Sequence, residues 1–240
     1  MRLLWIRDVP CGHALPEEPG PAAELLSAMR QRHVIWLAVP PGERGSRFPA
    51  AISCLYPPAS APGTPAGEAS GHTAPKRMPL SALLDAQAFD GAVLEGSECG
   101  SCIDLLPPPL RRRTVWYLPV LDWVEANTAD AAHRGSMRMR PWSRLRLSWL
   151  RSRRLRQAQA VGRCAVATRA DQAALRGAAP CLAPVLLVPA HLADAPDEER
   201  IVASSADKLD AVLQRLHQAA LRPPPIPGRA GRPLGHWWIR

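Results

Sequence analysis

The chain has 240 residues, 47% of them apolar, so it can bury the core of one large α/β domain or two small ones. It carries a formal charge of +9 and 27 prolines. No run of about 18 uncharged apolar residues occurs, and charge interrupts the first apolar run too early for a signal peptide. A cytoplasmic protein is therefore expected, with its six cysteines reduced.

Short apolar runs alternate with helical patterns along the chain. Strands are predicted at 3–6, 34–39, 51–56, 91–95, 114–118, 120–123, 165–168 and 185–188. Helices are predicted at 21–30, 80–87, 103–113, 142–160, 169–176 and 206–221, and prolines at 107–109 are expected to break the third of them. This alternation predicts an α/β fold with a doubly wound, Rossmann-like parallel sheet over 1–190. A flexible Pro/Gly-rich loop is expected at about 57–79, a linker and amphipathic helix at 191–222, and a proline-rich tail at 223–240.

The positive charge is concentrated in one segment. No acidic residue lies between Asp130 and Asp171, and that stretch holds eleven arginines; without them, 19 of the 30 basic residues remain, against 21 acidic ones. The helix at 142–160 carries Trp142, Leu145 and Trp149 on one face. Three roles stay open: packing of this stripe on the core, docking on an anionic membrane or an acidic partner, and nucleic-acid binding, for which no motif is present. Residues expected to carry the docking role are Trp142, Arg144, Arg146, Trp149, Arg151, Arg153 and Arg154.

Cys99 and Cys102 form a Cys-x-x-Cys pair. At the start of a helix, such a pair can lower the pKa of a thiol and support redox exchange; the alternative is that both side chains merely pack. Four ligands at metal-binding spacing are not found, so no metal site is expected. Phosphate-binding loops, nucleophile elbows and zinc-protease motifs are also absent from the sequence.

Seven segments, in order, carry a family likeness. They are MRLLWI at 1–6, RHVIWL at 32–37, FDGAVLEG at 89–96, PVLDWVEAN at 119–127, RRLR at 153–156, CAVATRADQAALR at 164–176 and PVLLVP at 184–189. Together they resemble the N-terminal domain of GT-B glycosyltransferases of the family-4 type, and among these the sugar transferases of exopolysaccharide clusters. The resemblance covers about 190 of the 240 residues.

The chain also departs from that family. Only about 50 residues follow Pro189, too few for a second, donor-binding domain. The family's two donor-site glutamates, eight residues apart, are absent. The resemblance therefore implies an acceptor-side domain, inactive alone, for bacterial polysaccharide or glycolipid assembly at the inner face of the cell membrane. A partner chain would supply the donor domain, a nucleotide-sugar would be the co-substrate, and a polyprenyl- or lipid-linked sugar the acceptor; no other cofactor is expected.

The resemblance assigns roles to residues after the strands, where ligands of doubly wound sheets bind. Asp122 and Glu125 are the catalytic candidates, because a carboxylate there would orient a sugar hydroxyl; for Asp122 the alternative is a cap on the turn or the next helix. The candidates for acceptor binding are Asp8, Gly12, His13, Glu95 and Asn127. Two other functions stay open: a non-catalytic binding module that uses the basic helix, and a thiol redox protein that uses Cys99 and Cys102.

Overall fold

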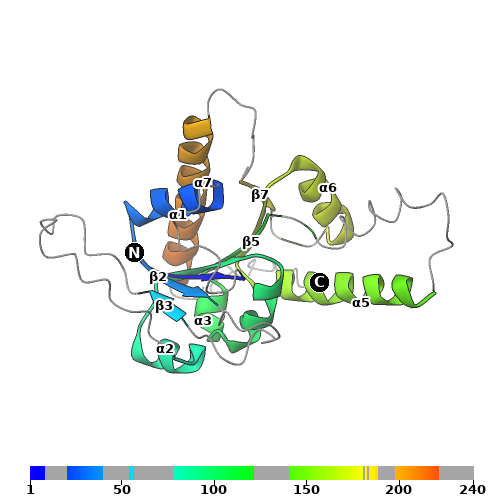
Figure 1. Ribbon diagram of the computed structural model, residues 1–240, viewed down its shortest axis with the longest axis horizontal. Helices are drawn as coiled ribbons and strands as arrows, with labels where there is room; N and C mark the ends of the chain where they lie inside the picture. Colours follow the sequence, from blue (N-terminus) through cyan, green and yellow to red (C-terminus); the bar gives the residue numbers. More distant parts are fainter. Residues whose placement is uncertain are drawn as a thin grey trace, which may run out of the picture.

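A single β-sheet with helices on both faces forms the centre of the computed structural model (Figure 1). The structure describes residues 1–8, 21–39, 54–56, 78–119, 121, 141–180, 182, 184–188 and 198–221. Its strands are β1 (Arg2–Arg7), β2 (Val34–Val39), β3 (Cys54–Tyr56), β4 (Gly91–Glu95), β5 (Thr114–Leu118), β6 (Arg163–Val166) and β7 (Leu186–Leu187). Its helices are α1 (Pro21–Arg30), α2 (Leu80–Ala86), the 3₁₀ helix η1 (Glu98–Leu105), α3 (Pro108–Arg111), α5 (Pro141–Ala160), α6 (Arg169–Ala178) and α7 (Glu198–Leu221).

The strand order of the sheet is β3-β2-β1-β4-β5-β6-β7. Six strands are parallel, and β3 pairs antiparallel with β2 at the edge. This is the order of a Rossmann-like doubly wound sheet. The predicted fold class, such a sheet followed by a C-terminal helix, is confirmed. A parallel strand buried on both faces must be apolar throughout, which explains why uninterrupted apolar runs produced β1, β4 and β5.

Alternate residues of each strand point to opposite faces of the sheet and contribute to two separate hydrophobic cores. Leu4, Ile6 and Leu94 face α2, η1, α5 and α6, where they pack with residues such as Leu83 and Leu175. On the opposite face, Leu3, Trp5, Val93, Val115 and Tyr117 pack against α1 and α7. The helices that contribute to this second core supply Leu25, Leu26, Met29, Ala206, Leu209 and Leu213.

Helix α7 is tied to the chain between α1 and β2. Arg32 pairs with Asp207 at 2.6 Å, and the ring of His33 lies 3.0 Å from the carboxylate of Asp210. The predicted helix at 206–221 is confirmed, but it starts earlier, at Glu198. Among the described residues, no helix is both long and apolar enough to cross a membrane.

The break predicted at the three prolines of the helix at 103–113 is confirmed, since this segment forms two short elements, η1 and α3, on either side of Pro107. The first of them starts earlier than predicted, at Glu98. The strand predicted at 120–123 and the loop and tail predicted at 57–79 and 223–240 lie largely or wholly outside the described residues.

Candidate functional site

The candidate site lies where the strand order reverses, between β1 and β4. From β1 the chain passes through α1 to β2 on one side, and from β4 it passes through η1 and α3 to β5 on the other. At such a reversal, the connections leave the carboxyl ends of the two strands in opposite directions and open a crevice for a ligand. Arg7 and Glu95 end these strands as register partners, and Asp8 and Gly96 follow them.

Glu95 is the buried centre of this edge, with only 5% of its surface exposed. One carboxylate oxygen pairs with the Arg7 guanidinium at 3.0 Å, and the other accepts a hydrogen bond from the indole N–H of Trp5 at 2.7 Å. Burial raises the pKa of Glu95, while the Arg7 charge opposes that rise. Both carboxylate oxygens are therefore engaged by β1, and Glu95 links the end of β4 to the end of β1.

Asp8 is the partly exposed carboxyl group at the same edge. Its own N–H donates to the carbonyl of Glu95 at 3.2 Å, which fixes the chain as it leaves β1. Burial raises the pKa of Asp8 above its ordinary value of 3.8, and a hydrogen bond from the backbone of Glu98 opposes the rise. An aspartate with a raised pKa is a stronger base than an exposed one, so Asp8 is the group best suited to accept a proton or a hydroxyl hydrogen bond here.

Gly96 makes the placement of Asp8 possible. Its φ is +102°, a backbone conformation that other residues rarely adopt. A Cβ on Gly96 would lie 1.9 Å from a carboxylate oxygen of Asp8. The Asp8 side chain therefore sits directly over the backbone of the turn that joins β4 to η1.

The raised pKa of Asp8 gives a testable pH dependence. The folded protein holds the Asp8 proton more tightly than the unfolded chain, so this contribution to stability is complete below pH 3.8 and is lost as the pH rises through the folded pKa. Asp8→Asn keeps an oxygen acceptor but cannot ionise. Between about pH 4 and pH 7, its free energy of unfolding should therefore fall less than that of the wild type.

Chemical denaturation at a series of pH values measures this difference. His33 acts in the opposite sense, because burial lowers its pKa from 6.5 and stability is lost as the pH falls. Its contribution is common to both proteins and cancels in the comparison. Parallel pH profiles for the wild type and Asp8→Asn would contradict a raised Asp8 pKa.

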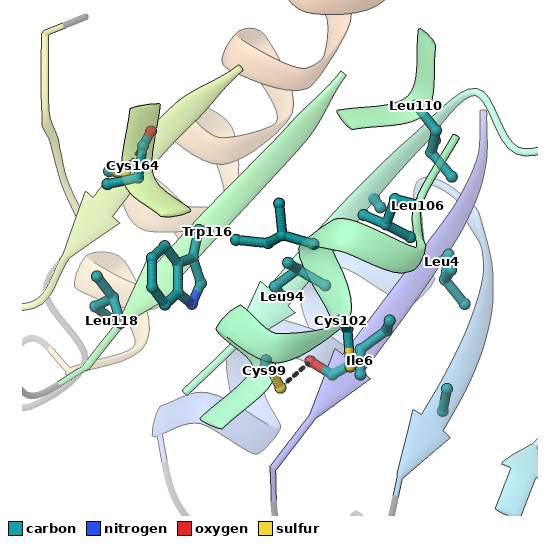
Figure 2. Packing of buried hydrophobic residues seen from close by; sticks show 14 of the residues in the cluster. Leu4, Ile6, Leu94, Cys99, Cys102, Leu106, Leu110, Trp116, Leu118 and Cys164 are labelled. Atoms are coloured by element: carbon teal, nitrogen blue, oxygen red, sulfur yellow. Dashed lines mark hydrogen bonds between the residues drawn. The ribbon is translucent and has the colours of Figure 1, made fainter. Parts of the chain in front are cut away.

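The two cysteines of the Cys-x-x-Cys pair are buried packing residues in the core. Figure 2 shows Cys99 and Cys102 among Ile6 and Leu94, with the Cys99 thiol directed at the carbonyl of Ile6. That thiol donates to the carbonyls of Glu95 at 3.1 Å and Ile6 at 3.5 Å. Burial raises the pKa of Cys99 well above normal and that of Cys102 to about 12. Redox exchange requires an accessible thiolate, so this arrangement disfavours the redox interpretation.

Arg154 links the site to helix α5. Only 3% of this residue is exposed, and its guanidinium donates to the carboxylate of Glu98 at 3.1 Å and to Gln157 at 3.4 Å. At Gly100 of η1, a Cβ would lie 2.6 Å from the Gln157 side-chain oxygen, so the absent side chain lets α5 approach η1 closely. The assignment of Arg154 to a membrane-facing set is therefore wrong: its helical position turns it inward to Glu98.

The rest of the predicted docking face points outward where its side chains are described. Trp149 is 55% exposed and Leu145 63% exposed, so the interpretation in which these two residues pack on the core is wrong. Arg151 is exposed and Arg153 partly so. The backbone of α5 includes Trp142, Arg144 and Arg146, but their side chains lie outside the described part.

Two of the predicted site residues, Asp8 and Glu95, are brought together. Five others, Gly12, His13, Asp122, Glu125 and Asn127, lie outside the described residues and stay predictions. Among the described residues, no group of three or more His, Cys, Asp or Glu side chains is placed to hold a metal ion.

Sequence reasoning missed the side chains that surround Glu95. Arg7 and Trp5 bind Glu95, and Tyr117 lies beside it in register. The buried hydroxyl of Tyr117 has no hydrogen-bond partner in the described structure, which leaves a donor free next to the Arg7–Glu95 pair. The signal available in the sequence was Arg7 itself, a charged residue that ends an apolar strand directly before Asp8.

Comparisons of the chain with protein-family models, with curated proteins and with solved structures gave no match. The fold and the geometry at the ends of β1 and β4 are therefore the basis for a functional proposal.

Proposed function

We propose that this chain is the acceptor-side domain of a GT-B type glycosyltransferase, and that it binds a sugar-bearing acceptor at the carboxyl ends of β1 and β4. The observation that carries the proposal is the Asp8 carboxyl group, partly exposed at the reversal of a Rossmann-like strand order. The same fold serves many functions, so the fold alone supports only the location of the site. The chemistry proposed for the site rests on the Asp8 carboxyl group. The segment resemblances supply the class of reaction.

In this proposal, Asp8 orients the acceptor. Its carboxylate accepts a hydrogen bond from a sugar hydroxyl and takes up that proton as the hydroxyl oxygen attacks the anomeric carbon of a nucleotide-sugar. The nucleoside diphosphate then leaves with the electrons of the bond that breaks. Glu95 does not touch the acceptor; with Arg7 and Trp5 it holds the two strand ends at a fixed distance.

Asp122 and Glu125 remain the candidates for a second carboxylate. They follow Leu121, a fully buried residue just after β5, and β5 is the neighbour of β4. The donor's diphosphate would be bound by a partner chain. Alone, the chain is therefore expected to bind an acceptor sugar without transferring to it.

Calorimetric titration tests this proposal with two ligand sets. One set is neutral and lipid-linked oligosaccharides, and the other is UDP-, GDP- and ADP-linked sugars. We expect saturable binding of at least one member of the first set, weakened about tenfold or more in Asp8→Asn, because a buried hydrogen bond to a charged group contributes about 1.5–3 kcal/mol. Asp104→Asn is the matched control, since Asp104 is exposed on η1.

Two results would count against the proposal. If no sugar of either set binds, the site is not an acceptor site. If an oligosaccharide binds equally to the wild type and to Asp8→Asn, binding takes place elsewhere on the chain. Saturable binding of a nucleotide-sugar that depends on Asp8 would change the assignment, since the same edge would then be a donor site.

A further inference from the structure

The outer face of helix α5 combines exposed apolar side chains with arginines. Leu145 and Trp149 are two of the five large apolar residues that are exposed in the described part of the chain. Arg156 is exposed on the same face and Arg153, beside it, is partly exposed, whereas the exposed Arg151 lies on another side of the helix. The sequence of α5 has six arginines and no acidic residue. Large apolar side chains exposed among charges of one sign mark an interaction surface.

The opposite side of α5 packs against η1. Its inner side is anchored to η1 through the buried Arg154, Gln157 and Ala158. From there α5 extends outward, with its first residues farthest from the sheet (Figure 1). The Arg153 guanidinium lies 5.5 Å from the centre of the Trp149 ring, a cation–π contact that holds the indole beside a positive charge at the surface.

We propose that the outer face of α5 docks on the surface of an anionic lipid bilayer. This inference goes beyond acceptor binding and does not rest on it. The charge is complementary to anionic headgroups, and each arginine near such a surface strengthens binding about fivefold. Tryptophan favours the headgroup level, and leucine enters the boundary with the acyl chains. A nucleic acid would match the arginines too, but it offers no apolar environment to Leu145.

Vesicle co-sedimentation of the full chain tests the proposal. The probes are vesicles of phosphatidylcholine alone and of phosphatidylcholine mixed with phosphatidylglycerol. We expect binding to the mixed vesicles only, with a steep loss between ~0.05 M and ~0.5 M salt as the charges are screened. Arg153→Gln with Arg156→Gln should weaken binding about 25-fold, from two contributions of about fivefold each. Trp149→Ala should weaken it about tenfold.

The matched control is Arg169→Gln with Arg176→Gln, which removes two exposed charges from α6 and leaves α5 intact. It should bind vesicles almost as the wild type does. Because all of these side chains are exposed or partly exposed, the variants should keep the circular dichroism spectrum and melting temperature of the wild type.

Several outcomes would overturn the proposal. Absence of binding to the mixed vesicles would do so, as would equal binding to neutral vesicles. If the α6 control lost as much vesicle binding as the α5 variant, net charge and not the face of α5 would account for the binding. Titration with single- and double-stranded oligonucleotides completes the test: tighter binding to either, weakened by the same α5 substitutions, would assign the face to nucleic acid instead.

Discussion

Glu95→Ala is expected to lower the free energy of unfolding by about 3–5 kcal/mol, since removal of one partner from a buried ion pair leaves the other charge uncompensated. Here the substitution removes the binding partner of two groups at once. The Arg7 guanidinium loses its carboxylate at 3.0 Å, and the indole N–H of Trp5 loses its acceptor at 2.7 Å. Urea denaturation followed by circular dichroism measures the loss.

Two further variants separate the ion pair from general damage. Glu24→Ala removes an exposed glutamate from α1 and should change stability by less than about 0.5 kcal/mol. Arg7→Ala combined with Glu95→Ala should cost less than the sum of the two single substitutions, because neither charge is then left alone. Strictly additive losses, or a loss below about 1 kcal/mol for Glu95→Ala, would mean that the pair does not hold the strand ends together.

Gly96→Ala should destabilise the fold by about 2–6 kcal/mol, because the new Cβ both strains the backbone and clashes with Asp8. A φ of +102° strains any residue with a Cβ, at a cost of about 1–3 kcal/mol. The new methyl group would also meet the Asp8 carboxylate, and overpacking of this kind typically costs about 1–3 kcal/mol. Thermal and chemical unfolding of the purified variant give the magnitude.

A second substitution distinguishes the two causes. In Gly96→Ala combined with Asp8→Ala the clash is gone and only the backbone strain remains, so the double variant should be more stable than the two single losses predict. Gly177→Ala is the matched glycine control. It lies in α6 with no atom within 4 Å of an added Cβ, and alanine there should stabilise the helix by about 0.5–1 kcal/mol. If Gly96→Ala unfolds like the wild type, the turn after β4 does not have the described conformation.

The strands were accessible from the sequence because each parallel strand consists mainly of a run of apolar residues, and their alternation with helical patterns predicted a doubly wound parallel sheet. The order of the strands was not predicted. Asp8 and Glu95 were both candidates for acceptor binding because the carboxyl ends of parallel strands form the ligand-binding edge of such a sheet, but their contact with each other was not predicted. Helix α7 was placed less well at its start, because apolar periodicity reveals a helix only where one face is buried. In α7, the first buried residues among those whose side chains are described are Ser205 and Ala206.

What the sequence could not reveal depends on contacts between distant segments. The 3₁₀ helix η1 begins at Glu98, in a stretch with Gly100 and Ser101 that favours no helix. It is held by the Cys99 thiol and by the hydrogen bond between the Glu98 backbone and Asp8. The inward direction of Arg154 likewise depends on Glu98, which lies 56 positions earlier in the chain. Charge alone therefore grouped Arg154 with its exposed neighbours.

The position of α7 has a consequence for the order of events during synthesis. This helix covers Val93 and Val115 on one face of the sheet together with α1, yet it is translated after all seven described strands. Until Leu209 and Leu213 emerge from the ribosome, a nascent sheet would expose the part of this apolar face that α1 does not cover. Exposed surface of this kind promotes aggregation. This face of the sheet can therefore be fully covered only after α7, the last helix of the described part, has been made.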